Sequence, residues 1–170
     1  MCFKMIFICS TLIGISVTAV AQSKSPSDTI LTMKGIGPVQ LGMTVQESSI
    51  ASGTSLKKDD SMDGDKYRFF GTKDTYFWVG AKDGRIHMAC ARSDRVSTSH
   101  GIRIGDTTKK FDQFPRSTIK HMKNPLYYQL QSTDQKDKGH IIWFEVSGNK
   151  IEGICAGTPT LLAYVMEGGT

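Results

Sequence analysis

Short segments in which apolar and polar residues alternate fill most of the chain after residue 66. Alternation from one residue to the next is typical of strands that bury one face. It predicts strands over residues 67–71, 75–80, 85–91, 95–99, 126–131, 140–146, 150–156 and 160–166. Asp83-Gly84 and Gly148-Asn149 each separate two of these strands and are typical hairpin turns. The pattern therefore indicates a mainly antiparallel β-structure.

Two short helices are expected between the strands. The first is predicted over 44–51, because its opening threonine and Glu47 have the spacing of a capping box. Asp106 or Thr107 caps the second helix, which Pro115 ends. Short extended lead-ins precede both helices. The sequence thus predicts an α+β fold.

An internal repeat runs through the same region. Residues 76–90 match residues 141–155, and residues 38–44 match residues 101–107. The paired residues are Trp78 with Trp143, Ile86 with Ile151, and Cys90 with Cys155. Self-similarity at a nearly fixed period indicates tandem duplication. The predicted fold is two tandem repeats, each a short helix plus a three- or four-stranded antiparallel meander, joined in one larger sheet with the helices on one face.

The N-terminus has the features of a secretory signal peptide. A positive Lys4 precedes an apolar run that ends in Ala19-Val20-Ala21. A transmembrane anchor is the alternative, but the run is short and ends in a cleavage site. We therefore expect a periplasmic or secreted bacterial protein with no stable membrane insertion after cleavage. The predicted division is a signal peptide at 1–21, a flexible arm at 22–35, repeat units at 36–99 and 100–170, and one compact domain.

Signal cleavage leaves two cysteines, Cys90 and Cys155, since Cys2 and Cys9 lie in the removed segment. In an oxidising compartment, cysteines at matching repeat positions favour a disulfide between the repeats. The alternatives are two buried free thiols that pack as small apolar groups, and, less favoured, a nucleophilic cysteine.

Strand alternation also assigns side chains to faces. The residues assigned to the helix-covered core are Phe77, Val79, Ile86, Met88, Cys90, Ile142, Phe144, Ile151, Gly153 and Cys155. Tyr76 and Trp78 then point to the other face, together with Trp143. We expect these three side chains and Tyr127 to form an open aromatic surface that binds a partner, because exposed aromatics are typical interface anchors. Packing of each tryptophan against its own hairpin is the alternative.

Charge and motifs exclude several classes of function. The net charge of +5 is mild, and no Arg-rich run supports nucleic-acid binding. The four histidines form no zinc spacing, and residues 59–65 match a calcium loop only in part, because Phe70 stands where a glutamate is required. No P-loop, dinucleotide fingerprint or nucleophile elbow is present. We expect no cofactor, no metal and no enzyme activity.

The stretch Gly37-Pro38-Val39-Gln40-Leu41-Gly42-Met43-Thr44, followed later by Asp83-Gly84-Arg85-Ile86, resembles exported proteins of the β-lactamase inhibitory protein type. The small lipoprotein of the outer-membrane β-barrel assembly machinery looks similar within one repeat. The resemblance implies helix-plus-sheet units that bind by a concave sheet face. The second copy departs from the motif, with Ile104-Gly105-Asp106-Thr107.

Together these features predict an exported, non-enzymatic module of the cell envelope that binds a protein, with inhibition of an envelope or extracellular enzyme as one form. The alternatives are an accessory factor in outer-membrane or cell-wall maintenance, and, less favoured, a small-ligand carrier or a hydrolase.

Overall fold

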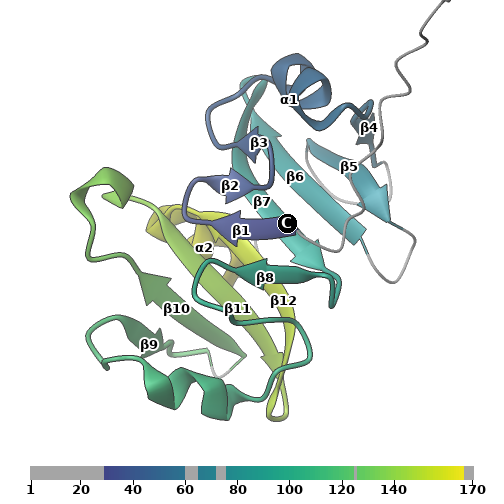
Figure 1. Cartoon of the computed structure of the whole chain (residues 1–170). Coiled ribbons are helices and arrows are strands. Elements are labelled where there is room, and N and C mark those ends of the chain that lie inside the picture. Colours follow the sequence, from purple (N-terminus) through teal and green to yellow (C-terminus); the bar gives the residue numbers. More distant parts are fainter. Residues whose placement is uncertain (1–28, 60–64, 72–75, 125, 167–170) are drawn as a thin grey trace, which may run out of the picture.

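The structure, a computed structural model, describes residues 29–59, 65–71, 76–124 and 126–166. Its main feature is an eight-stranded antiparallel sheet in the order β4-β5-β6-β7-β12-β11-β10-β9 (Figure 1). The strands are β4 (Lys57–Lys58), β5 (Lys66–Gly71), β6 (Tyr76–Lys82), β7 (Arg85–Arg92), β9 (Ile119–His121), β10 (Tyr127–Gln131), β11 (Ile141–Ser147) and β12 (Lys150–Gly157). Two four-stranded meanders meet at β7 and β12, where Cys90 pairs with Cys155. The six predicted strands of this central region are confirmed.

A smaller sheet covers one face of the large one, in the order β3-β2-β1-β8 (Figure 1). Its strands are β1 (Thr29–Thr32), β2 (Gly35–Ile36), β3 (Val39–Gln40) and β8 (Val96–Thr98), and β1 pairs with β8 in parallel. Residues 29–32 were expected in a flexible arm, but they pair with both β2 and β8. The strand predicted over 95–99 is present as β8, but it belongs to this small sheet.

Local hydrogen bonding explains the first helix, α1 (Val45–Ser52). The Thr44 hydroxyl accepts from the Glu47 backbone N–H at 3.1 Å, and the Glu47 carboxylate accepts from the Thr44 N–H at 2.7 Å. The predicted capping box is thus confirmed. The second predicted helix is a 3-10 helix, η2 (Thr108–Gln113), and a further short one is η3 (Gln135–Asp137).

The strand predicted over 160–166 is wrong, because this segment forms helix α2 (Pro159–Met166). Thr158 begins it, since its hydroxyl accepts from the Leu161 N–H at 3.3 Å and its carbonyl accepts from the Leu162 N–H. Proline at the first helical position has a favourable φ and lacks only an N–H that the helix leaves unpaired. In the described part of the chain, no helix has the length and apolar character needed to cross a membrane.

A β-bulge in the first long hairpin changes which side chains share a face. Gly80 pairs with Met88, but the next pair is Ala81 with Ile86, which leaves His87 as the extra residue. Ile86 therefore faces the small sheet, whereas Met88 faces the other side. The prediction that Ile86, Met88 and Cys90 share one face is wrong for this reason.

The second hairpin carries a bulge at the matching place, between Glu145 and Val146. It likewise separates Ile151, in the main core, from Cys155 on the opposite face. The chain nevertheless does not show two equivalent helix-and-meander units. The first meander is accompanied by α1, the second by a 3-10 helix, and α2 follows β12. The observed fold is α+β with two sheets and few helices.

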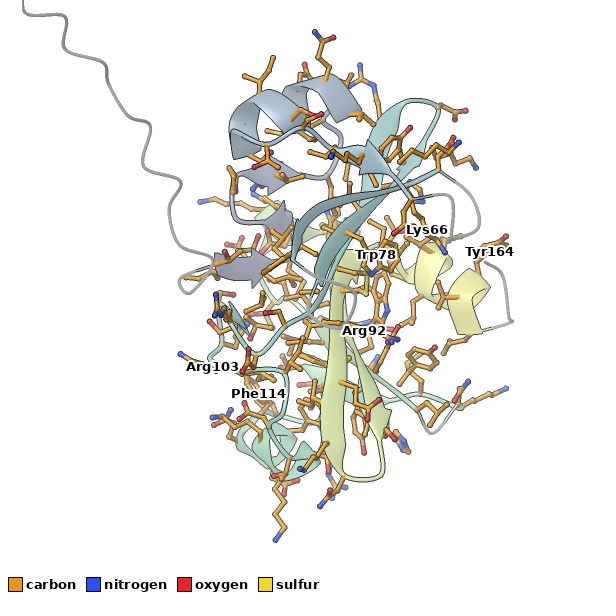
Figure 2. All side chains as sticks on the ribbon, turned by 90° about the vertical axis from the view of Figure 1, so that its right-hand side faces the viewer. Lys66, Trp78, Arg92, Arg103, Phe114 and Tyr164 are labelled. Carbon is orange, nitrogen blue, oxygen red and sulfur yellow. A yellow bond between two sulfur atoms is a disulfide. The ribbon has the colours of Figure 1, made fainter. Side chains whose placement is uncertain are left out.

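Two hydrophobic clusters lie on opposite faces of the large sheet. The main core lies between the two sheets, and its largest fully buried side chains include Phe77, Phe144, Leu31, Ile36 and Ile142. The second cluster lies under α2 and contains Met88, Cys90, Ile141, Trp143, Cys155 and Leu162. Figure 2 shows α2 on the side of the large sheet away from the small one. Helix α1 packs with β3 of the small sheet, whereas α2 lies on the opposite face of the large sheet. The prediction that both helices lie on one face is therefore wrong.

Candidate binding cleft

A single row of side chains crosses the centre of the large sheet beneath α2. Trp78 pairs with Cys90, Cys90 with Cys155, and Cys155 with Trp143. Directly paired residues on neighbouring strands project from the same face of a sheet. The two cysteines form the predicted disulfide, with an S–S distance of 2.04 Å. The alternative of two free thiols is therefore wrong.

Trp143, at one end of the row, belongs to the core. It is 1% exposed, and its indole N–H has no hydrogen-bond acceptor among the described residues. Gly157 allows this packing, because a Cβ there would lie 2.9 Å from a carbon of the Trp143 ring. Leu162 of α2, which is fully buried, joins the same cluster. The expected open aromatic face is therefore closed by α2 on the β11 side.

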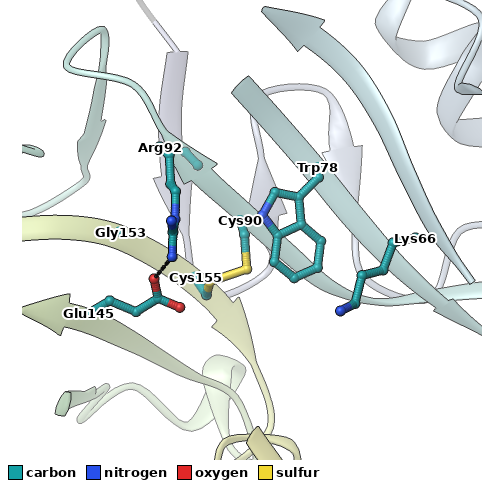
Figure 3. Close-up of a pocket in the computed structure, with 8 residues that line it drawn as sticks. Lys66, Trp78, Cys90, Arg92, Glu145, Gly153 and Cys155 are labelled. Atoms are coloured by element: carbon teal, nitrogen blue, oxygen red, sulfur yellow. Dashed lines mark hydrogen bonds and ion pairs between the residues drawn. A yellow bond between two sulfur atoms is a disulfide. The ribbon is translucent and has the colours of Figure 1, made fainter. Parts of the chain in front are cut away.

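Trp78, at the other end of the row, is only half-buried. The Lys66 ammonium lies 5.4 Å from the centroid of its ring, and Figure 3 shows the indole between this lysine and the disulfide. A cation over an indole ring contributes about 0.5–1 kcal/mol at exposed sites. Tyr127 is also half-buried and pairs with Glu145. The backbone of Tyr76 belongs to β6, but its side chain lies outside what the structure describes.

A cleft of about 860 Å³ opens between α2 and the β5–β7 side of the sheet. Its apolar lining comes from both sides: Trp78, Met88, Tyr127, Leu161, Tyr164 and Val165. In Figure 2, Lys66 and Trp78 lie beside α2, which carries Tyr164. Ligand sites are typically clefts of about 300–1,000 Å³ with mainly apolar walls and a few polar groups. The cleft has the dimensions and lining of such a site.

Among the described residues, four charged side chains line the cleft, and the two acids are each engaged in an ion pair. Glu145 accepts from Arg92 at 2.6 Å, and Asp65 accepts from Lys58 at 2.8 Å. Gly153 makes the first pair possible, because a Cβ there would lie 2.7 Å from the Glu145 carboxylate (Figure 3). This ion pair also lines a smaller pocket of about 200 Å³ beside Trp78 and the disulfide.

The remaining cations of the cleft are Lys66 and Lys82. Among the ion pairs formed within the described residues, neither ammonium has a carboxylate partner. Within the described part of the chain, the charge left uncompensated at the cleft is therefore positive.

Two groups of the cleft have perturbed proton affinities. Burial lowers the pKa of His87 below its ordinary value, and the positive Lys82 lowers it further, whereas a backbone hydrogen bond at Arg85 acts in the opposite direction. Burial raises the pKa of the Tyr127 hydroxyl, and the Glu145 carboxylate adds to this effect. Both groups are thus held in their neutral forms near neutral pH.

Trp78 and Tyr127, which the sequence predicts on one surface, both line the cleft, but sequence reasoning missed the rest of it. No sequence feature singled out Lys66 or Lys82, and Met88 was assigned to the helix-covered core. The helix that forms the outer wall was predicted as a strand, although Thr158-Pro159 is a recognisable helix start. The partial calcium motif at 59–65 falls mostly outside the described residues.

No protein-family model matches the chain, and a search of curated proteins finds no match. Several solved structures are similar in fold. The uncharacterized protein YfeY of Escherichia coli is 13% identical, with a TM-score of 0.49. The match covers 75% of this chain and 98% of YfeY. A cysteine-rich secretory protein of Staphylococcus aureus is 16% identical, with a TM-score of 0.46. The match covers 74% of this chain and 47% of the Staphylococcus protein.

The third similar structure is an extracellular protein containing an SCP domain from Bacillus anthracis, with 10% identity and a TM-score of 0.41. The match covers 94% of this chain and 52% of the Bacillus anthracis protein. This chain therefore spans about half the length of each of the last two proteins. None of the three is of the β-lactamase inhibitory protein type. Because the expected helix-and-meander repeats are also not shown, the resemblance drawn from the sequence is wrong. At these identities and TM-scores, the likenesses carry no argument about function.

Proposed function

We propose that the protein is an exported, non-enzymatic binding protein that holds an apolar ligand in the cleft between α2 and the large sheet. The observation that carries this proposal is the cleft of about 860 Å³, with aromatic and aliphatic side chains on both sides. Trp78 is its most accessible tryptophan, since Trp143 is 1% exposed. A half-buried indole beside an apolar cleft supplies a large contact area for a ligand.

Export is supported by the sequence and by the disulfide. The N-terminal segment has the order of a signal peptide, a positive Lys4, an apolar run and a small-residue cleavage site. Cys90 and Cys155 are bonded, and structural disulfides persist in oxidising compartments such as the periplasm and the cell exterior. The proposed location is therefore periplasmic or extracellular.

Binding without catalysis is supported by the ion pairs and hydrogen bonds of the polar groups in the cleft. The cleft carboxylates, Asp65 and Glu145, are paired with Lys58 and Arg92. His87 is half-buried with a lowered pKa, and within the described residues no hydrogen bond joins it to a hydroxyl or a thiol. A nucleophile and its base need such a contact. The arrangement favours holding a ligand over transforming it.

A fluorescent probe tests the proposal directly. N-phenyl-1-naphthylamine is neutral and becomes bright in apolar surroundings, so the processed protein should bind it saturably. Trp78→Ala removes part of the apolar lining of the cleft and should weaken the binding of the probe. Gly80→Leu places a side chain into the cleft and should also weaken it. Ile50→Ala, at a site on α1 that is 75% exposed, is the control and should leave binding unchanged.

The proposal fails if the wild-type protein gives no saturable signal, or if all four proteins bind the probe equally well. Circular dichroism of each variant separates loss of the cleft from loss of the fold. The protein partner predicted from the sequence stays a prediction. Capture from an envelope extract with wild-type and Trp78→Ala protein tests it independently.

A further inference from the structure

Gly80 marks a low point in the floor of the cleft. On this face its neighbours across the ladder are Lys66 on β5 and Met88 on β7. Trp78 and Lys82 flank it along β6, because alternate residues of a strand project to the same side. All five residues line the cleft. The glycine at the centre contributes no side chain of its own, and it is buried among an indole, a thioether and the side chains of two lysines.

The space at Gly80 is bounded by flexible groups. A Cβ at this position would lie 3.0 Å from the terminal methyl of Met88 and 3.4 Å from the His87 ring. Methionine side chains adapt readily to the shape of what they contact. The Met88 methyl thus fills the space over Gly80, and because it can move, the floor can adapt to the shape of a ligand group.

Among the described residues, the charges around this point that lack an ion-pair partner are positive. Lys66 and Lys82 have no carboxylate partner among the ion pairs of the described residues, whereas Asp65 and Glu145 are each paired with a cation outside the floor. Lysine can pack its aliphatic stem along an apolar surface while its ammonium stays at the rim. The two stems thus extend the apolar floor, and their ends present positive charge beside it.

The opposite wall is apolar. Leu161 and Val165 of α2 line the cleft across from Trp78 and Met88, and Leu161 packs against the cluster beneath the helix. An occupant therefore meets aliphatic and aromatic surface along α2 and β7, and cations on β5 and β6.

We infer that the occupant is a single-chain anionic amphiphile, a fatty-acid-like molecule with its chain between α2 and the Trp78–Met88 floor and its head group at Lys66 and Lys82. This inference rests on the proposed function and names its ligand class. A neutral chain would leave the two ammonium groups unneutralised, and a cationic head group would be repelled. An anion gains charge-assisted hydrogen bonds at the boundary of an apolar site, where such bonds are strong.

Three ligands with one chain and different head groups test the inference. Decanoate, decanol and decyltrimethylammonium are each used to displace N-phenyl-1-naphthylamine from the processed protein, below their micelle-forming concentrations. Decanoate should displace the probe at a concentration about tenfold lower than decanol, the factor that one charge-assisted hydrogen bond supplies. Decyltrimethylammonium should be the weakest of the three.

Variants assign the preference to the two lysines. In Lys66→Gln/Lys82→Gln protein, decanoate should lose its advantage, while decanol displaces the probe as before. Lys109→Gln/Lys150→Gln protein is the matched control, because it removes the same charge at exposed positions that do not line the cleft, and it should keep the preference.

Equal displacement by decanoate and decanol in the wild type would overturn the inference, and so would a preference that survives in the Lys66→Gln/Lys82→Gln protein. A polyglutamate peptide that displaces the probe more strongly than decanoate would assign the site to an acidic peptide instead. In these three cases the probe itself still binds, so the proposed function stands. Absence of probe binding would refute the proposed function, and the inference with it.

Discussion

Removing the disulfide should lower the stability of the protein by several kcal/mol. Cys90 and Cys155 are 65 residues apart in sequence, and they join β7 to β12 where the two meanders meet. A crosslink of that span removes about 15 cal/mol/K from the entropy of the unfolded chain, which is about 4 kcal/mol at room temperature. Domains of this size are stable by about 5–15 kcal/mol, so the loss is a large fraction of the total.

Urea denaturation followed by circular dichroism measures this effect in Cys90→Ala/Cys155→Ala protein. The variant should unfold at a much lower urea concentration than the oxidised wild type. Reduced wild-type protein is the control, because it keeps both sulfur atoms in the core and lacks only the bond. If the reduced protein and the variant both lost less than about 1 kcal/mol, the account of the disulfide as the main constraint between the meanders would be refuted.

Three further predictions concern packing, capping and pH. Gly157→Val places a side chain against the Trp143 ring and should lower the thermal stability by about 1–3 kcal/mol, and an unchanged melting temperature would contradict this close approach. Thr44→Ala removes the hydroxyl that caps α1 and should cost about 1 kcal/mol in a urea titration, whereas no change would show that Glu47 alone suffices. Burial depresses the pKa of His87 below its ordinary value of 6.5, so the unfolded chain binds this proton more readily, and stability should fall as the pH drops from 6.5 toward the folded pKa. Urea titrations across this range should show a smaller fall for His87→Gln, and identical profiles would contradict the assignment.

The central strands were predictable because their signal is local. Alternating residues, the Asp83-Gly84 turn and the capping box at Thr44 lie within a few positions of each other in the sequence. These features fixed β5, β6, β7, β10, β11, β12 and α1 to within about two residues. The disulfide was also predictable, because the two cysteines occupy matching positions in the two hairpins.

The faces of the strands were less predictable because a bulge shifts alternation by one residue. His87 carries no feature that distinguishes a bulge residue from an ordinary strand residue, and the shift moved Met88 from the predicted core into the cleft. The pairing of β1 with β8 depends on contacts across a long stretch of sequence, which local patterns do not report.

The cleft was missed because the last element was misread. Residues 160–166 are mostly apolar and include Tyr164 and Val165, residue types that are common in strands, so a strand was predicted. Thr158 and Pro159, however, supply a helix cap and a first helical residue. Once α2 is a helix, it covers Trp143 and leaves Trp78 accessible along its edge. The open aromatic face expected from the sequence is thereby reduced to a cleft.

Amide NMR on addition of N-phenyl-1-naphthylamine is the most direct test of the cleft as a binding site. The account predicts saturable chemical-shift changes in β5, β6, β7 and α2, centred on Gly80 and Trp78, with little change in β1, β2 and β3. Shifts centred on the small sheet, or no saturable shifts in a folded protein, would contradict it.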